Sequence, residues 1–201
     1  MPRPRLRTDD DILDAAIALF WRQGFAATSM RDLTQETGLG AAALYHRFGD
    51  KNGLFLAALR RYAERGLSRR LTRLGRMRSA RRAVAAFFDE LIAAAKSDCE
   101  RRGCLLVNTA LDGAATTREA RALVRDRLGE IETFFRERLE TAQREGTLAP
   151  DVRPKDAAEE LLAAVLAIRV LARLDPEPRK LRRVARRALA IFEQSPMEYS
   201  A

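Results

Sequence analysis

The chain has 201 residues, in which 37 lysine and arginine side chains outnumber 28 aspartate and glutamate side chains, for a net charge of +9 at pH 7. Charges interrupt every apolar run before it reaches the roughly 18 residues of a membrane span, so we expect no membrane segment. The N-terminus has no apolar signal core, and two cysteines without an export signal fit a reducing compartment, so we expect a cytoplasmic protein. The positive excess suits a polyanionic partner, although arginines beyond the first third of the chain could equally cover solvated helix faces.

Apolar residues recur every three or four positions along most of the chain, which predicts an all-α fold. Thr8 is the expected N-cap of the first helix, because three aspartates follow it and favour the positive end of the helix dipole. Gly24 is the expected end of this helix. Its apolar side chains, from Ile12 to Phe20, share one face and should pack against the helices that follow.

Two short helices separated by a glycine follow the first helix. Thr28 or Ser29 can cap the earlier one, and Gly38 is placed to reverse the chain in a left-handed conformation after its last turn. The later helix runs from about residue 40 to residue 48. This spacing predicts a helix-turn-helix at residues 29–48, with a second helix sized for the DNA major groove.

The remaining sequence continues the helical pattern to near its end. Further helices are predicted at about residues 51–73, 80–96, 104–111, 117–145, 155–174 and 181–192. The predicted domains are a DNA-binding domain at residues 6–66 and a second helical domain at residues 67–201. The last two helices, at about residues 155–193, are rich in alanine and predict a four-helix homodimer interface; a monomer that packs both faces internally is the alternative.

The helix-turn-helix region also carries a recognisable order of residues. In chain order, the residues concerned are Thr28-Ser29, Gly38-Leu39, Leu44-Tyr45, Phe48-Gly49, Lys51 and Leu54-Phe55. This order resembles the DNA-binding region of the tetracycline-repressor (TetR) family of bacterial transcriptional regulators. The resemblance implies a three-helix N-terminal domain, a C-terminal helical domain for ligand binding and dimerisation, and repression at a palindromic operator that is relieved by a small-molecule effector.

The predicted recognition helix departs from the family pattern at its start. Gly40-Ala41-Ala42-Ala43 stand where relatives often have a hydroxyl residue followed by a basic one, and alanine can contact a thymine methyl but cannot donate a hydrogen bond. We therefore expect few base contacts and greater reliance on DNA shape. By family position, Tyr45 and Lys51 should bind phosphate. The predicted DNA-contacting residues are Thr28, Ser29, Arg31, Gly40, Ala41, Ala42, Tyr45, His46, Arg47 and Lys51.

The resemblance further implies an effector pocket within about residues 80–174. The candidate lining residues, which are equally good core residues, are Phe87, Phe88, Leu91, Cys104, Val107, Asn108 and Phe134. The segment GCLLVNTALD is similar to one in a TetR subgroup with quinone- and electrophile-responsive members, in which a cysteine at this place senses modification. Cys104 is thus either a sensor or a small buried core residue.

Other chemistry lacks the residues it needs. One histidine and two cysteines do not have the number or spacing of a zinc site, and the sequence has no phosphate-binding glycine loop, nucleophile elbow or catalytic triad. We expect no enzymatic activity, metal or cofactor. The predicted function is that of a sequence-specific transcriptional repressor that a small-molecule effector releases from DNA, with electrophiles as one candidate class of effector. The alternative is a basic architectural nucleic-acid-binding protein without an effector.

Overall fold

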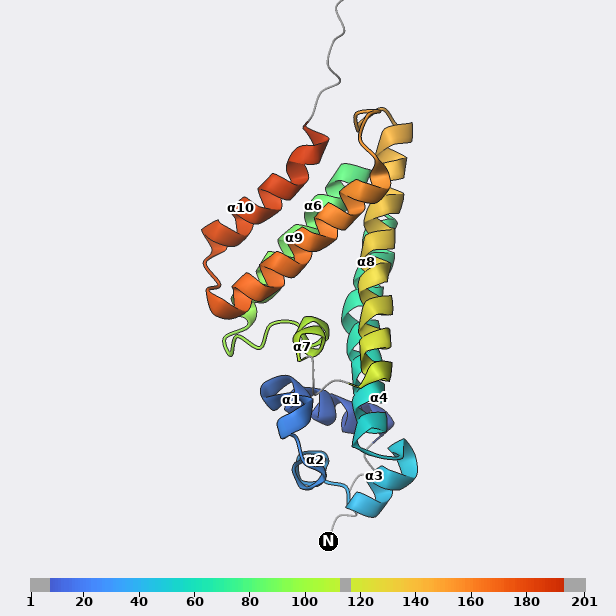
Figure 1. Ribbon diagram of the computed structural model, residues 1–201, viewed down its shortest axis with the longest axis vertical. Coiled ribbons are helices and arrows are strands. Elements are labelled where there is room, and N and C mark those ends of the chain that lie inside the picture. Colours follow the sequence, from blue (N-terminus) through green and yellow to red (C-terminus); the bar gives the residue numbers. More distant parts are fainter. Residues whose placement is uncertain (1–7, 113–116, 194–201) are drawn as a thin grey trace, which may run out of the picture. The chain divides into compact units, whose positions relative to one another are not determined.

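The computed structural model describes residues 8–112 and 117–193, and this part of the chain contains helices and no strand (Figure 1). The predicted all-α fold is therefore confirmed. The helices are α1 (Asp9–Ala27), α2 (Met30–Thr37), α3 (Ala41–Phe48), α4 (Lys51–Ala63), α5 (Arg69–Gly75), α6 (Ala80–Ser97), α7 (Leu105–Leu111), α8 (Arg118–Arg144), α9 (Pro154–Leu174) and α10 (Pro178–Leu189). A π-helical segment (Glu64–Ser68) joins α4 to α5, and a 3₁₀ turn (Ala190–Phe192) follows α10.

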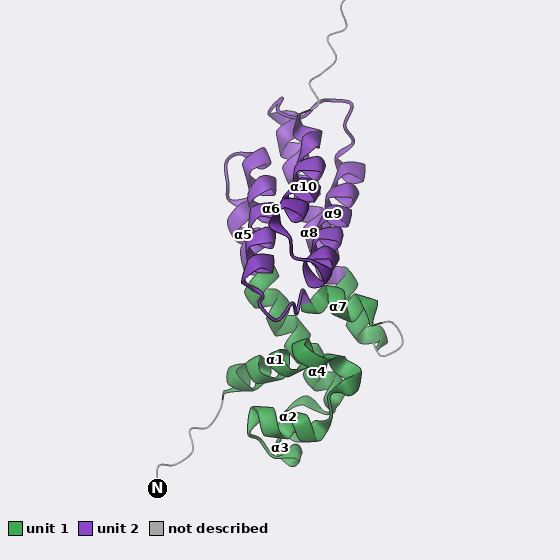
Figure 2. Ribbon diagram, turned by 90° about the vertical axis from the view of Figure 1, so that its left-hand side faces the viewer, with its two compact units in different colours: residues 1–67, 105–125 green, residues 68–104, 126–201 purple. Residues whose placement is uncertain are grey.

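Packing divides the chain into two compact units, which Figure 2 draws in different colours. Unit 1 comprises residues 1–67 and 105–125, and unit 2 comprises residues 68–104 and 126–201. The first boundary lies close to the one expected after residue 66. The segment 105–125 differs from the expectation, because it groups with the helix-turn-helix part of the chain rather than with the second domain.

Unit 1 is built on α1 and α4, which pack against each other along an aromatic core. The ring centroids of Phe20 and Phe25 each lie 4.8 Å from that of Phe55. Helix α7 contacts both α1 and α4, since its apolar residues Leu105 to Val107 are buried. Burial of this short, uncharged helix is the physical reason why α7 belongs to unit 1.

Unit 2 is a bundle of α5, α6, α9, α10 and most of α8. Four phenylalanines of α6 and α8 fill its centre, and each is at most 5% exposed: Phe87, Phe88, Phe134 and Phe135. The loop from α8 to α9 is fixed by Gln143, whose side-chain amide donates to the carbonyls of Ala149, Pro150 and Val152 at 3.0–3.4 Å.

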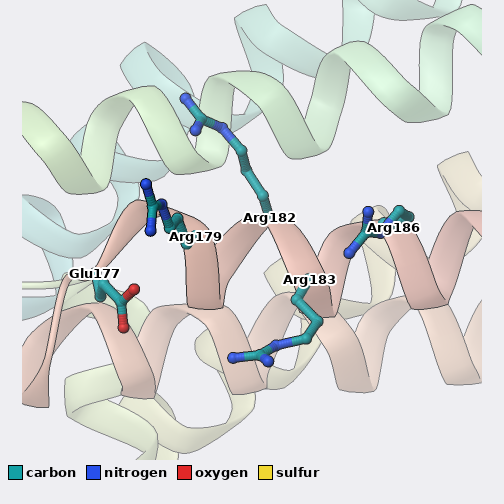
Figure 3. Close-up of a pocket in the computed structure, with 5 residues that line it drawn as sticks. All are labelled: Glu177, Arg179, Arg182, Arg183 and Arg186. Atoms are coloured by element: carbon teal, nitrogen blue, oxygen red, sulfur yellow. The ribbon is translucent and has the colours of Figure 1, made fainter.

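Helix α10 separates apolar and charged residues onto opposite faces. Leu181 and Ala185 are buried against α6 and α9, whereas the arginines between them are exposed. Arg182 and Arg183 leave the helix in opposite directions (Figure 3). An open hollow of about 650 Å³ lies along this face and is lined by Glu177, Arg179, Arg182, Arg183 and Arg186.

Candidate nucleic-acid interface

Helix α2 begins at a reciprocal cap made by Ser29 and Asp32. The backbone N–H of Asp32 donates to Ser29 Oγ at 3.1 Å, while the backbone N–H and hydroxyl of Ser29 donate to Asp32 Oδ2 at 2.8 and 2.7 Å. These hydrogen bonds from Ser29 lower the pKa of the Asp32 carboxyl. The two residues satisfy N–H groups that an uncapped helix end leaves unpaired, so the start of the motif is fixed locally.

The turn between α2 and α3 depends on Gly38 and Thr37. Gly38 has φ 68° and ψ 17°, a left-handed conformation that glycine adopts without steric cost, and its N–H donates to Thr34 O at 2.9 Å. The buried hydroxyl of Thr37 donates to Leu33 O at 2.6 Å and accepts from the N–H of Leu39 at 3.4 Å. Backbone and side chain together set the direction in which α3 leaves the turn.

Helix α3 is held by one buried side chain and exposes most of its others. Leu44 is 1% exposed and anchors the helix to the unit 1 core. Ala41, Ala42, Tyr45 and His46 share an exposed face, and Tyr45 alone is 48% exposed. A large aromatic side chain left in water on a short helix is available to a partner.

A three-residue turn connects the end of α3 to α4. Gly49 has φ 82° and ψ −71°, and the N–H of Asp50 donates to Phe48 O at 3.1 Å, which makes Phe48–Asp50 a γ-turn with a positive φ at its centre. Asp50 then caps α4 by accepting from the N–H of Gly53 at 2.7 Å. The tight connection places the carbonyl of Phe48 directly against the first turn of α4, where it leaves no room for a Cβ at Gly53.

Ion pairs to the first turns of α1 fix α4 against it. Arg61 donates to both carboxylate oxygens of Asp14, at 2.7 and 3.0 Å, and contacts Asp10 at 2.5 Å, while Arg65 also binds Asp14. The hydrogen bonds from Arg61, followed by those from Arg65, lower the pKa of the Asp14 carboxyl from 3.8 to about 2. A bidentate arginine pair of this kind orients two helices as well as attracting them.

The depressed pKa of Asp14 predicts how the stability of unit 1 depends on pH. Because the folded pKa lies below the unfolded one, the ion pairs stabilise the fold fully above about pH 4, and that contribution is lost as the pH falls towards 2. Asp14 is 42% exposed, so solvent screening limits the contribution to about 1 kcal/mol. Asp14→Asn should have a lower free energy of unfolding than wild type at pH 7, as measured by denaturant titration. The difference in free energy of unfolding between the two proteins should become smaller as the pH falls to 2. Asp126→Asn is the control, and an Asp14→Asn deficit that stays constant from pH 7 to pH 2 would contradict the assignment.

Lys51, in the first turn of α4, closes the end of α1. Its Nζ donates to the carbonyls of Phe25 and Thr28, both at 3.0 Å, and lies 4.3 Å from the centroid of the Phe25 ring. These carbonyls stand at a helix end, where intrahelical partners are missing and the helix dipole favours a cation. An ammonium group has three N–H donors, so one remains beyond these two hydrogen bonds.

Comparison with known sequences identifies the family. Residues 12–58 match the family described as bacterial regulatory proteins, tetR family, and residues 80–189 match the tetracyclin repressor-like C-terminal domain. This chain belongs to the TetR family. The helix-turn-helix and helices α6, α9 and α10 of unit 2 therefore lie within regions that match the TetR family.

Similar proteins cover nearly the whole of this TetR regulator. The HTH-type transcriptional repressor ComR of Escherichia coli K12 is 28% identical over 193 residues, which are 96% of this chain and 92% of ComR. A cysteine mutant of the TetR family regulator CifR, solved with a 26-bp double-stranded operator DNA, is 32% identical with a TM-score of 0.80, covering 94% of this chain and 98% of that one. A TetR regulator from Chloroflexus aurantiacus is 25% identical with a TM-score of 0.81, covering 92% and 94%. The TetR regulator described here is accordingly a DNA-binding transcriptional regulator.

The ten predicted DNA contacts of this TetR regulator differ in their exposure. Eight are exposed, namely Ser29, Arg31, Gly40, Ala41, Ala42, Tyr45, His46 and Arg47. Thr28 is 1% exposed and its hydroxyl donates to Gly24 O at 2.6 Å, so its side chain holds the end of α1. The DNA contact expected from Thr28 or Ser29 stays a prediction, and of these two side chains that of Ser29 is exposed. Lys51 is half-buried by the contacts described above, and its phosphate contact stays a prediction.

The predicted effector-lining residues are divided between the two units. Phe87, Phe88, Leu91, Cys104 and Phe134 belong to unit 2, whereas Val107 and Asn108 belong to unit 1. The phenylalanines contact one another: the rings of Phe87 and Phe134 lie 6.0 Å apart, centroid to centroid. They form the packed core of unit 2, and the location of an effector site stays a prediction.

The structure also brings together residues that the sequence analysis did not connect. Asp9 and Asp10 were interpreted through the helix dipole alone and Asp14 was assigned no role, yet each of the three contacts an arginine 38 to 51 positions away. No local pattern signals such pairs.

Among residues 8–112 and 117–193, no group of three His, Cys, Asp or Glu side chains is arranged to hold a metal ion, and no helix is both long and apolar enough to cross a membrane.

Proposed function

We propose that this TetR regulator is a cytoplasmic homodimeric repressor, which binds a palindromic operator through α3 and releases it when a small molecule binds to unit 2. The observation that carries this proposal is the grouping of residues 105–125 with the helix-turn-helix part of the chain. Helix α7, which follows the bundle residues 68–104 in sequence, thus packs directly on α1 and α4.

Specific contacts support a mechanical role for this segment. The N–H of Leu105 donates to the hydroxyl of Tyr62 at 3.4 Å, and the hydroxyl of Thr117 donates to the side chain of Asn52 at 3.0 Å. Both acceptors are on α4, which directly follows the turn after α3. A shift of residues 105–125 would therefore act on the helix that positions the recognition helix.

Two of the three passages of the chain between the units are helical. The passage after Leu67 lies at the π-helical segment between α4 and α5, and the passage after Arg125 lies within the 27 residues of α8, about 40 Å of helix. A helix transmits a displacement at one end to the other more directly than a flexible loop. Repression is relieved if the effector prefers a dimer conformation whose recognition helices no longer fit half-sites about 34–36 Å apart.

The dimer would form through the last two helices, with unequal roles for them. Helix α9 exposes Ala163, Ala167, Val170 and Leu174, spaced as one stripe, and Leu174 is 70% exposed. Alanines allow close helix approach, so this stripe suits the centre of a two-fold interface. The arginine face of α10 suits its polar rim.

An electrophile is one candidate class of effector, with Cys104 as the sensor. Cys104 is 8% exposed at the last position of unit 2 before α7, so a covalent adduct there would disturb the packing of α7. The CifR protein solved with operator DNA carries substitutions at cysteines. Cys104→Ser should abolish the release of operator DNA by a quinone, measured by fluorescence anisotropy. Cys99→Ser, at the exposed cysteine, is the matched control, and full release from Cys104→Ser would refute the sensor role.

The first experiment measures binding of the purified protein to its own upstream DNA and to a scrambled duplex at two salt concentrations. We expect a preference of at least about a thousandfold for the upstream DNA, with two chains bound per site. Equal and steeply salt-dependent binding to both duplexes, and to every other fragment of a genomic library, would favour an architectural role. The exposed Gly40, Ala41 and Ala42, which offer no side-chain donors to bases, would then account for the lack of preference.

A further inference from the structure

Arg47 of the recognition helix α3 forms an ion pair with Asp9 of α1. Arg47 lies in the last turn of α3, next to the exposed Tyr45 and His46, and its Nη1 is 2.9 Å from Oδ1 of Asp9. Asp9 is the first residue of α1. A carboxylate thus contacts the helix that faces DNA in the proposed function.

The exposure of this pair makes it exchangeable. The side chains of Arg47 and Asp9 are 33% and 69% exposed, and a single hydrogen bond is formed between them. By contrast, the Arg61 side chain is 15% exposed and binds Asp14 through two nitrogens. An exposed pair contributes little to stability, so an incoming anion displaces Asp9 from Arg47 more readily than Asp14 from Arg61.

The acids near the start of α1 divide into three roles. Asp11 completes the cap with Thr8, and Asp10 and Asp14 bind Arg61 of α4. Asp9 is the member of this acidic run that contacts α3. Its charge is therefore not needed for the α1–α4 attachment, and its effect can be separated from that attachment by mutation.

We propose that Asp9 competes with DNA phosphate for the Arg47 guanidinium and thereby lowers the affinity of this TetR regulator for duplex DNA of any sequence. The inference rests on the proposed function in using α3 as the recognition helix. Carboxylate and phosphate both bind the planar N–H donors of arginine. A phosphate that binds Arg47 must replace Asp9, so the net binding free energy is the difference between the Arg47–phosphate and Arg47–Asp9 contacts. Asp9 is thus an intramolecular competitor of phosphate, and it weakens DNA binding without contacting any base.

A double-mutant cycle with a scrambled duplex tests this competition. Asp9→Asn keeps the size of the side chain and removes its charge, so it should tighten binding about three- to tenfold and raise the salt slope by about one, as one more phosphate contact forms. The same substitution in an Arg47→Ala background should change neither quantity. Glu64→Gln, at an exposed carboxylate of unit 1, is the control for loss of a negative charge, and thermal unfolding confirms that each variant is folded.

Two results would overturn the competition. Unchanged or weaker binding by Asp9→Asn would exclude it, and an equal gain in the Arg47→Ala background would assign the effect to net charge instead. Both results differ from a failure of the proposed function, in which the wild-type protein itself would not bind its operator in preference to the scrambled duplex.

Discussion

Gly53→Ala should abolish operator binding and destabilise unit 1 by about 3 kcal/mol or more. A Cβ at residue 53 would stand 1.9 Å from Phe48 O and 3.1 Å from Phe48 C, both backbone atoms that no side-chain rotation can move. Relief requires the γ-turn at Phe48–Asp50 to open, and that turn sets the angle between α3 and α4. The recognition helix would lose its orientation even in molecules that remain folded.

The control for this prediction is Gly129→Ala in the middle of α8. A Cβ there would meet no atom within 4 Å, so the change should stabilise the helix by up to about 1 kcal/mol through helix propensity. Denaturant unfolding and operator binding are measured for both variants. A Gly53→Ala protein that unfolds and binds DNA like wild type would show that the α3–α4 connection tolerates an opened turn.

Features encoded within a few residues were predictable from the sequence. The Ser29 and Asp32 cap and the left-handed Gly38 involve neighbours at most four positions apart, so residue type and spacing specify them. The inward position of Leu44 follows in the same way from helical periodicity. The exposed face of α3 was thereby predictable as well, because it is what this anchor leaves outside.

Features that depend on tertiary packing were not predictable. Nothing near Asp14 in sequence indicates Arg61, and the family position of Lys51 suggested phosphate while the structure adds its contacts with α1. The grouping of residues 105–125 with unit 1 has the same origin: an apolar helix predicts burial, but not the surface that buries it. The charge or hydrophobicity of a residue indicates which type of residue it will contact, but the particular residue or surface is determined by the tertiary fold.

Lys51→Ala should lower both the stability of unit 1 and its affinity for DNA of every sequence. The substitution leaves the carbonyls of Phe25 and Thr28 without their ammonium donor, and a hydrogen bond to a charged group contributes about 1.5–3 kcal/mol net of its exchange with water. Because Lys51 is half-buried, water replaces part of this contribution. We expect a loss of about 2–3 kcal/mol in the free energy of unfolding. Lys96→Ala, at an exposed lysine on α6, is the control.

The salt dependence of binding separates the two roles of Lys51. A residue that only holds α1 and α4 together would, when removed, weaken binding at all salt concentrations alike, because the number of phosphate contacts would not change. If the third N–H of Lys51 binds phosphate, Lys51→Ala should also lower the salt slope by about one. A stability loss with an unchanged slope would therefore reject the phosphate contact and keep the structural role. An unchanged stability with a lower slope would reject the structural role, since two hydrogen bonds to the end of α1 cannot be removed from a fold that depends on them without cost.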